Sequence, residues 1–266
     1  MQIATSLLPY AGYHRSAVVT PRTRVEDSRY VVRFANSHEE IESALKLRFE
    51  VFNLELGEGL DASFLTGRDR DHFDATSQHL IVIEKSTDRV IGTYRVRTLE
   101  MAQTVDGFYS AGEFELNQLP FQVLSDSVEL GRACIAQAHR GHQVLFLLWK
   151  ALAQHTVDEG KRFLFGCCSM TSQSPAEGIK LFRQLSEDGH LHSSVRINPK
   201  PGFECTADST WSSNVDLPRL FRTYLSIGAK VCGPPAIDRE FKTIDFFVIF
   251  DLFQMTQKTR RLLFGK

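Results

Sequence analysis

The sequence predicts a mixed α/β domain, of the α+β kind, in which helices flank one mixed central sheet. Consecutive strands in the first half, strand–helix pairs in the second half and an apolar strand near the C-terminus support this fold class. The 266 residues suffice for one large domain, and no internal repeat divides them. The regular alternation of a doubly wound dinucleotide fold is missing, as are the two common glycine-rich phosphate-binding signatures.

The first half is expected to contain an arm, a capped helix and a long loop between strands. Residues 1–29 mix Ser, Thr, Pro and charge, which is typical of a poorly ordered arm. Ser37 precedes Glu40 by three residues, and apolar residues at helical spacing follow, so a helix is expected to start there. Glu55–Asp74 is rich in Gly and Asp and is expected to be a long loop. The predicted strands are Tyr30–Phe34, Leu80–Glu84 and Val90–Arg97.

The second half predicts three helices between further strands. Gly141 precedes an apolar-periodic helix, and Ser174-Pro175 predicts the start of the next one. Leu217–Leu225 is expected to form a short helix, and residues 256–266 a basic, partly apolar tail. The predicted strands are Val128–Ala136, Phe163–Ser169 and Thr243–Leu252.

Composition and charge exclude several classes of protein. With 42% hydrophobic and 24% charged residues, the chain is an ordinary globular one rather than a disordered one. Lys+Arg 31 against Asp+Glu 32 gives a net charge of −1, so no nucleic acid is expected as a partner. The five cysteines include no Cys-x-x-Cys pair and predict buried, reduced thiols. No metal site is expected, because His190 and His192 lack an evident third ligand.

Location is predicted from what the sequence lacks. No apolar run approaches the roughly 18–20 residues of a membrane span, and the first thirty residues do not resemble a secretory signal. We therefore expect a cytoplasmic protein, with peripheral attachment to the inner face of the cytoplasmic membrane as an alternative. The terminal run with Lys258, Arg260 and Arg261 would suit an anionic membrane surface, or a solvated tail.

Four clusters of polar residues lie within or beside apolar elements. Each cluster also has a purely structural interpretation: in chain order, a solvated arginine, a turn or cap, a solvated strand face and an internal ion pair. Arg95 and Arg97 are expected on one strand face, because strand side chains alternate. The clusters are Arg48 with Phe52, Asp71 with Asp74, Arg95 with Arg97, and Glu129 with Arg132.

The last cluster is the most informative. Gly131 between Glu129 and Arg132 would tolerate a β-bulge that brings the two charged side chains together. A carboxylate held near arginines on such a strand suits the handling of an amine. Arg140-Gly141 leads directly into a helix, whose free N–H groups would favour a phosphate.

Taken together, these segments resemble the GNAT-related acyltransferases that depend on acyl carrier protein. The nearest resemblance is to the L-ornithine Nα-acyltransferase family of ornithine-lipid synthesis, often labelled hemolysin-like. It implies a GNAT-like single domain over residues 30–255, with an extended C-terminal portion. The matching stretches are Leu47–Asn53, Asp71–Asp74, His79–Val82, Gly92–Arg97, Phe114–Leu116, Glu129–Ala133, Gly233–Asp238 and Thr243–Phe246.

The chain is also similar, more distantly, to acyl-homoserine-lactone synthases, which remain an alternative together with other N-acyl amino acid synthases. The long portion after Ser174 and the absence of Trp from Leu56–Gly59 favour the amino-acid acyltransferase. The acetyl-CoA pyrophosphate signature is incomplete, because Arg140-Gly141 has no second glycine nearby. This departure agrees with a carrier-protein donor. A non-enzymatic lipid-binding protein is a third reading.

The resemblance implies transfer of a fatty acyl group, often 3-hydroxylated, from acyl carrier protein to the α-amine of ornithine, giving a lyso-ornithine lipid. No bound cofactor is implied, since the acyl-phosphopantetheine of acyl carrier protein is the donor substrate. Glu129 is the expected base, with Arg132 and Arg95 as further catalytic residues. The expected substrate-binding residues are Arg48, Phe52, Asp71, Asp74 and Arg97, and Arg140 and Gly141 are expected to bind the phosphopantetheine.

Overall fold

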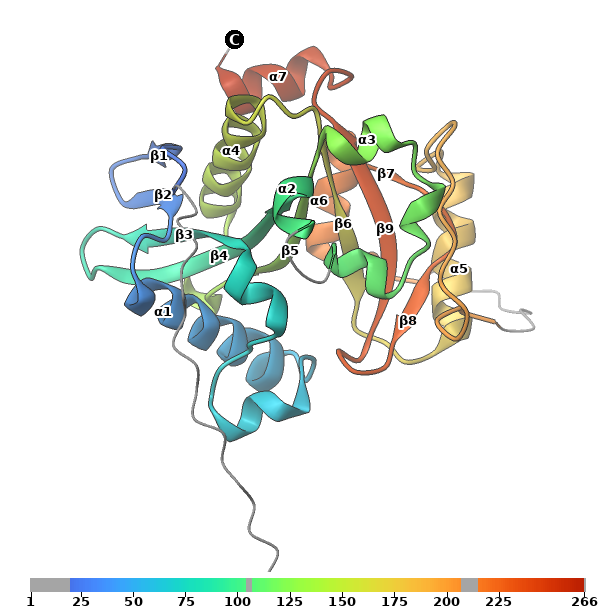
Figure 1. The fold of residues 1–266 in the computed structure, drawn as a ribbon, viewed down its shortest axis with the longest axis horizontal. Coiled ribbons are helices and arrows are strands. Elements are labelled where there is room, and N and C mark those ends of the chain that lie inside the picture. Colours follow the sequence, from blue (N-terminus) through green and yellow to red (C-terminus); the bar gives the residue numbers. More distant parts are fainter. Residues whose placement is uncertain (1–19, 104–106, 207–214, 266) are drawn as a thin grey trace, which may run out of the picture.

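The computed structural model describes residues 20–103, 107–206 and 215–265, and its core is one mixed sheet flanked by helices (Figure 1). This confirms the predicted fold class. The nine strands follow the order β1-β2-β3-β4-β5-β6-β9-β7, with β8 also paired to β9. Their bounds are β1 Arg24–Glu26, β2 Tyr30–Phe34, β3 Gln78–Glu84, β4 Arg89–Thr98, β5 Ser127–Ile135, β6 Phe163–Met170, β7 Lys230–Val231, β8 Ala236–Asp238 and β9 Thr243–Asp251.

Seven α-helices and several single turns connect these strands within the described ranges. The α-helices are α1 His38–Phe49, α2 Leu99–Ala102, α3 Phe121–Ser125, α4 His142–Asp158, α5 Pro175–Glu187, α6 Arg219–Ile227 and α7 Gln257–Phe264. The shorter turns are η1 Glu50–Glu55, η2 Asp61–Leu65, η3 His72–Thr76, η4 Tyr109–Gly112, η5 Leu116–Gln118 and η6 Gln137–His139. In this part of the chain, no helix combines the length and the apolar character that crossing a membrane requires.

The sheet has two differently covered faces, because side chains alternate along each strand. On one face, here called the α1 face, Ala44 of α1 packs with Ile81 and Ile83 of β3. On the opposite face, here called the α4 face, Leu80 of β3 belongs to the large core that includes Leu148 of α4. The helices α5, α6 and α7 contribute buried side chains to that same core, and α7 lies beside α4 (Figure 1).

The helix ends follow the expected local signals. Ser37 Oγ accepts a hydrogen bond from the N–H of Glu40 at 3.3 Å and caps α1. The helix α6 ends at Gly228, whose φ of 112° lies in the left-handed region that glycine tolerates. Gly141 stands immediately before α4, as expected.

Both expected terminal segments are more structured than their sequences indicated. The strand β1 falls within the arm expected over residues 1–29, because Val25 pairs with Val32 of β2; residues 1–19 lie outside the described part. The expected tail folds into α7, where Thr256 accepts a hydrogen bond from the N–H of Thr259 and Leu263 is only 1% exposed. The basic side chains of α7 therefore sit on a docked helix.

The strands β5 and β6 run parallel only briefly before they separate. Their ladder joins Ser127–Glu129 to Phe163–Phe165 and ends there. At this point Gly166 meets the carbonyl of Leu130 so closely that an added Cβ would lie 2.2 Å from that oxygen. Beyond it, the remaining halves of the two strands enclose a gap in the sheet.

The predicted β-bulge in β5 is present. The pairing of β4 with β5 shifts register between Thr93 and Arg95. The residue that takes the left-handed conformation is Arg132, with φ 49°, and not Gly131. The bulge therefore re-aims the Arg132 side chain next to the point where β5 leaves β6.

Candidate active site

A cavity of about 540 Å³ occupies the gap between β5 and β6. Consecutive residues of both strands line it, so that it is open to both faces of the sheet. On the α4 face the lining is mainly aromatic and aliphatic: Tyr94, Leu145, Trp149, Phe221, Tyr224, Val248 and Phe250. On the α1 face it carries polar and charged groups together with two phenylalanines: Phe52, Glu58, Tyr109, Arg132, Phe241 and Asp245. Two further charged residues of the lining, Arg140 and Arg219, lie at the starts of α4 and α6. The cavity thus passes through the plane of the sheet, with an apolar chamber at one end and a polar chamber at the other.

A buried ion network borders the polar chamber. Arg48 Nε donates to Asp69 Oδ1 at 2.7 Å, and Arg48 Nη1 donates to Asp74 Oδ1 at 2.7 Å. Arg132 Nη2 donates to Asp71 Oδ2 at 3.0 Å, and its Nε lies 3.3 Å from Asp69 Oδ1. Its members balance in charge: Arg48, Arg95 and Arg132 with Asp69, Asp71 and Asp74.

The charges of this network balance, although Asp69 Oδ2, Arg95 Nη2 and Arg132 Nε make no hydrogen bond in the described structure. Burial alone would raise the pKa of Asp74, but Arg48 and Arg95 outweigh burial and hold that pKa far below its usual value. The Arg48 side chain is 0% exposed, and of the six network residues only Arg132 lines the cavity. Arg48, Asp71 and Asp74, expected to bind substrate, therefore fix the loop after α1 against the sheet in this geometry.

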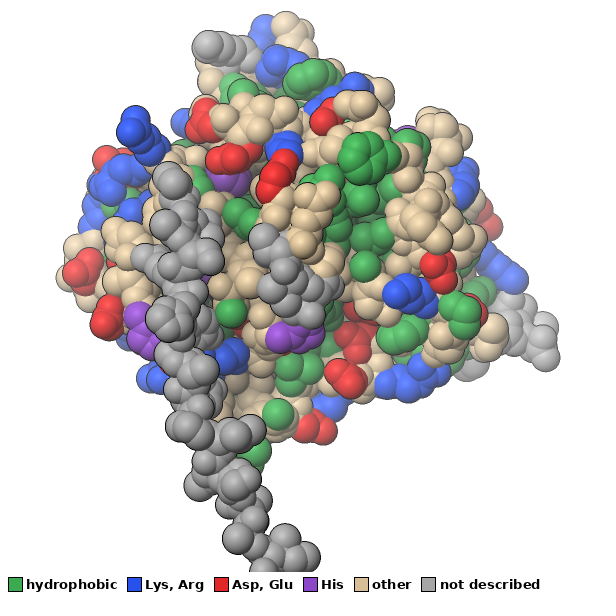
Figure 2. Space-filling view, in the orientation of Figure 1, with side chains coloured by type: hydrophobic (Ala, Val, Ile, Leu, Met, Phe, Trp, Pro, Cys, Tyr) green, Lys and Arg blue, Asp and Glu red, His purple; other side chains and the backbone are tan. Residues whose placement is uncertain are grey.

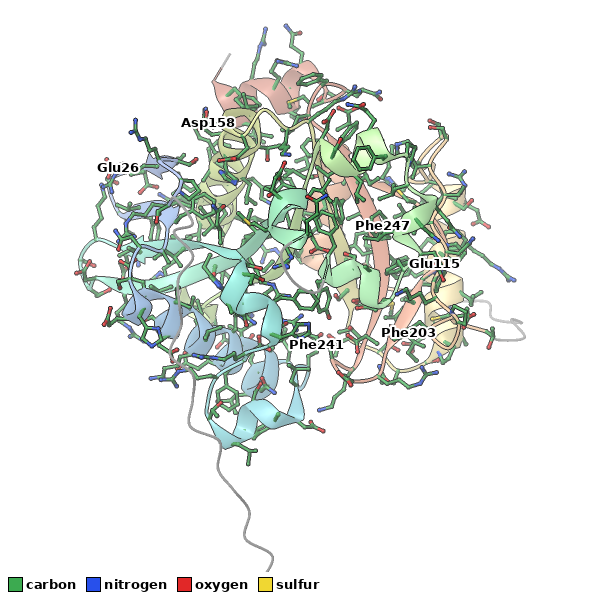
Figure 3. All side chains as sticks on the ribbon, viewed as in Figure 1. Glu26, Glu115, Asp158, Phe203, Phe241 and Phe247 are labelled. Atoms are coloured by element: carbon green, nitrogen blue, oxygen red, sulfur yellow. The ribbon has the colours of Figure 1, made fainter. Side chains whose placement is uncertain are left out.

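Two other residues expected to bind substrate have different roles in the geometry. Arg97 donates to the carbonyl of Gly107 and to Thr76 Oγ1, each at 2.7 Å, and so holds the chain that leads into η4. Phe52 lines the cavity and packs against Phe241, with ring centroids 5.3 Å apart. Phe241 lies in the turn between β8 and β9, on the side that faces η1 (Figure 3).

Glu129 and Arg132 are not joined to each other; both contact Tyr109. The Glu129 carboxylate accepts hydrogen bonds from Tyr109 N at 2.9 Å, Ser110 N at 2.8 Å and Ser110 Oγ at 2.7 Å. Burial raises the pKa of Glu129, although these hydrogen bonds oppose the shift. The Arg132 guanidinium lies 4.8 Å from the centre of the Tyr109 ring. Glu129 does not line the cavity, whereas Tyr109 does.

Arg140 and Gly141 lie together at the edge of the cavity. Gly141 is the N-cap of α4, and both residues are part of the lining. Arg140 forms an ion pair with Glu55 of η1, with Nη2 2.7 Å from Oε2. The start of α4 therefore presents backbone N–H groups and one basic side chain next to the gap.

The sequence reading missed a cluster of carboxylates on the α1 face. Asp245 lies in β9, lines the cavity and is 3% exposed, and its Oδ1 has no hydrogen-bond partner. A single carboxylate within the apolar segment Thr243–Asp251 was the available signal. The cluster consists of Glu58, Glu113, Asp238 and Asp245, which influence one another's charge states.

A thiol adjoins this cluster. Carboxylate oxygens of Glu113 and Asp245 and the Cys167 sulfur lie within 4.8 Å of one another, a spacing that a metal ion could bridge. Burial, followed by the charges of Glu113 and Asp245, raises the pKa of Cys167 well above its usual value. A metal ion bound there would displace the thiol proton, since metals bind the thiolate.

Comparison with known proteins indicates which class of protein the chain resembles. Residues 47–150, which run from the end of α1 through the bulge to the middle of α4, match the family model of the acetyltransferase (GNAT) domain. The mixed sheet flanked by helices agrees with that match. The chain is therefore similar to acyltransferases of the GNAT-related class.

Within this class, the resemblance read from the sequence is confirmed. The L-ornithine N(alpha)-acyltransferase of Rhizobium meliloti (strain 1021) is 27% identical over 257 residues, covering 91% of this chain and 87% of the relative. The protein of the same name from Brucella abortus (strain 2308) is 29% identical over 252 residues, covering 85% of this chain and 86% of the relative. Among solved structures, the AHL synthase LasI aligns with 15% identity and a TM-score of 0.49, covering 90% of this chain and 96% of LasI.

Proposed function

We propose that this acyltransferase moves a fatty acyl group from the phosphopantetheine thioester of acyl carrier protein to the α-amine of ornithine, giving a lyso-ornithine lipid. The observation that carries the proposal is the cavity through the sheet, with an apolar chamber on the α4 face and a charged one on the α1 face. An acyl chain suits the first chamber and an amino acid the second. The names of the curated relatives support ornithine as the acceptor.

The donor end is proposed to lie at the start of α4. A phosphopantetheine arm carries one phosphate, which the free N–H groups at a helix N-terminus and a neighbouring arginine would bind. Gly141 and Arg140 supply these groups, and Arg219 adds a second basic side chain to the lining. Trp149 and Phe250 lie further inside, where the acyl chain would pack. No resident cofactor is needed.

The chemistry is aminolysis of a thioester, in which the amine attacks the carbonyl and the thiol leaves. An ammonium cannot attack, so the α-amine must first lose a proton to solvent, and the second proton, released when the amide forms, passes to the departing thiolate. The backbone N–H groups of β5 beyond its ladder with β6 would stabilise the oxyanion that forms. Arg132 on the bulge faces the same chamber and would orient the acceptor's carboxylate. No acyl-enzyme is required, because the amine is itself a competent nucleophile.

Glu129 is proposed to position Tyr109 rather than to take the proton directly. Its two oxygens accept three hydrogen bonds from η4, and the residue lies outside the cavity lining. A base role predicts that Glu129→Gln abolishes an ionisation in the pH profile of kcat. A positioning role predicts a lower melting temperature and a reduced rate with that ionisation retained.

The experiment is a reconstitution with purified protein. It would supply 3-hydroxyacyl carrier protein and ornithine, with 3-hydroxyacyl-CoA as the comparison donor, and identify products by mass spectrometry. Amide-linked N-acyl ornithine formed faster from the carrier protein is the expected result. An acyl-homoserine lactone formed from S-adenosylmethionine, or no acylation with either donor, would overturn the proposal.

We place the reaction at the inner face of the cytoplasmic membrane, where an amphiphilic product must go. Hydrophobic side chains gather on the surface around α3, where Phe121 is 71% exposed (Figure 2). The exposed side of α7 adds Lys258, Arg260 and Arg261. Apolar and basic groups together suit anionic lipid. Sedimentation with anionic but not neutral vesicles is expected, and equal recovery with both would contradict this placement.

A further inference from the structure

We propose that Asp245, with Glu58 and Glu113 beside it, forms a subsite that binds the side-chain ammonium of a diamino acid acceptor. This subsite would set the preference for a cationic over a neutral amino acid. The inference rests on the proposed function, because it names the part of the same site that recognises the acceptor's side chain.

The position of Asp245 is the first observation. It lies in β9 opposite Ser169 of β6, on the α1 face, and its side chain reaches the cavity. It is 3% exposed, and its Oδ1 has no hydrogen-bond partner in the described structure. A buried carboxylate oxygen without a donor is costly, and native structures seldom retain one. Because Asp245 also lines the cavity, a donor on a ligand held there would satisfy this oxygen.

The second observation is a surplus of negative charge. The largest influences on the pKa of Asp245 are burial, Ser169, Asp238, Thr243 and Glu113, and no basic side chain is among them. Burial and the neighbouring Asp238 raise this pKa to about 6, although hydrogen bonds with Ser169, Thr243 and Glu113 oppose the shift. The adjoining ion network differs, because it contains as many arginines as aspartates. A bound cation would relieve the repulsion within the carboxylate cluster.

Glu58 extends the subsite along the cavity wall. It is buried, lines the same chamber and accepts a hydrogen bond from Thr171 Oγ1. Burial raises the pKa of Glu58, and the charge of Asp245 adds to that shift, so the two carboxylates act on one another. Glu113 stands behind Asp245, outside the lining; burial and the charge of Asp245 raise the pKa of Glu113 well above its usual value, and the two carboxyl groups share a hydrogen bond.

An ammonium fits this arrangement better than other cations. It has three donors in a compact head, and it can approach several carboxylate oxygens at once. A planar guanidinium would instead favour a bidentate fork with a single carboxylate. A metal ion held by Cys167 would displace the thiol proton, so divalent metal is one of the ligands that the binding measurement compares.

The test compares ornithine with norvaline, which has the same carbon skeleton but lacks the side-chain amine. In the wild-type protein, kcat/KM should favour ornithine. Asp245→Asn should lower kcat/KM for ornithine at least tenfold and change that for norvaline less than threefold. Glu58→Gln should act in the same direction with a smaller effect. Asp251→Asn is the matched control, because it removes a carboxylate from the far end of β9, away from the cavity lining.

Equal losses for both acceptors in Asp245→Asn would overturn the subsite. A binding measurement separates this failure from failure of the proposed function. Ornithine should raise the melting temperature of the wild-type protein and of Asp251→Asn, but not that of Asp245→Asn. If ornithine protects all three equally, the subsite is wrong. If protection depends on Asp245 although no acylation is found, the subsite stands and the proposed reaction fails. Stabilisation by divalent metal but not by ornithine would also overturn the ammonium assignment.

Discussion

Replacing Asp245 with Asn is expected to stabilise the ligand-free protein at neutral pH, although the residue belongs to the proposed site. The folded protein raises the pKa of Asp245 from 3.8 to about 6. Because the folded state holds this proton more tightly than the unfolded chain, stability is lost as the pH rises from about 4 to about 6. Above that range the full loss of folding stability caused by the ionised carboxylate is present.

The magnitude follows from the same shift. Two pKa units, at about 1.4 kcal/mol each, correspond to roughly 3 kcal/mol of lost stability at pH 8. Asn occupies the same space without the charge, and its amide donates to a neighbouring carboxylate. The variant should therefore gain up to about 3 kcal/mol, or several degrees of melting temperature in a chain of this size.

Urea unfolding of the wild-type protein and Asp245→Asn across pH 4 to 8 measures this gain. The difference in unfolding free energy should be small at pH 4 and should grow through pH 6. Asp251→Asn should instead be less stable than wild type by a nearly constant amount over this range: although burial opposes it, Arg162 lowers the pKa of Asp251 from 3.8, so the stability that this carboxylate contributes is already present at pH values above 3.8. A variant Asp245→Asn that is less stable than wild type at pH 8, or a difference independent of pH, would refute the reasoning.

Three further predictions follow from the fold. Gly166→Ala should lower the free energy of unfolding by about 1–3 kcal/mol, because the added Cβ would lie 2.2 Å from the Leu130 carbonyl oxygen. In the same urea unfolding assay Gly131→Ala should be near neutral, because its Cβ meets nothing within 4 Å. Arg48→Met should destabilise the protein by about 3–5 kcal/mol, because it leaves the three aspartates of the buried network with only two arginines; an equally stable variant would show that the network contributes nothing. Leu145→Trp should shorten the acyl chain preferred in competition between carrier proteins of different chain length, because Leu145 lines the apolar chamber; an unchanged preference would place the chain elsewhere.

Much of the fold could be predicted because its main elements carry their own local signals. The strand Leu80–Glu84 is apolar, and Ser37 and Gly228 mark helix ends by capping chemistry. The strands β7 and β8 contain only two and three residues. Such short segments are strands only because β9 pairs with them, and that pairing is not visible in local sequence.

The candidate site was predictable only in part, for a related reason. Arg132 and Gly141 stand in segments with recognisable local patterns, and both line the cavity. Arg48 stood out as a charge in an apolar helix, but its partner Asp69 comes from a distant loop. The sequence could not distinguish an internal ion pair from a substrate contact. Asp245 and its neighbouring carboxylates come from separate elements, so only the folded sheet brings them together.

The passage of the cavity through the sheet has a consequence for how the product departs. In the proposed reaction, the new amide forms between β5 and β6, with a charged head on one side and a fatty tail on the other. Drawing the head back through the apolar chamber would strip its charges of solvent. The tail must instead pass through the gap in the sheet and follow the head group out of the polar chamber. Departure therefore slows as the tail lengthens, and long-chain donors should give a burst of first-turnover product that short-chain donors lack.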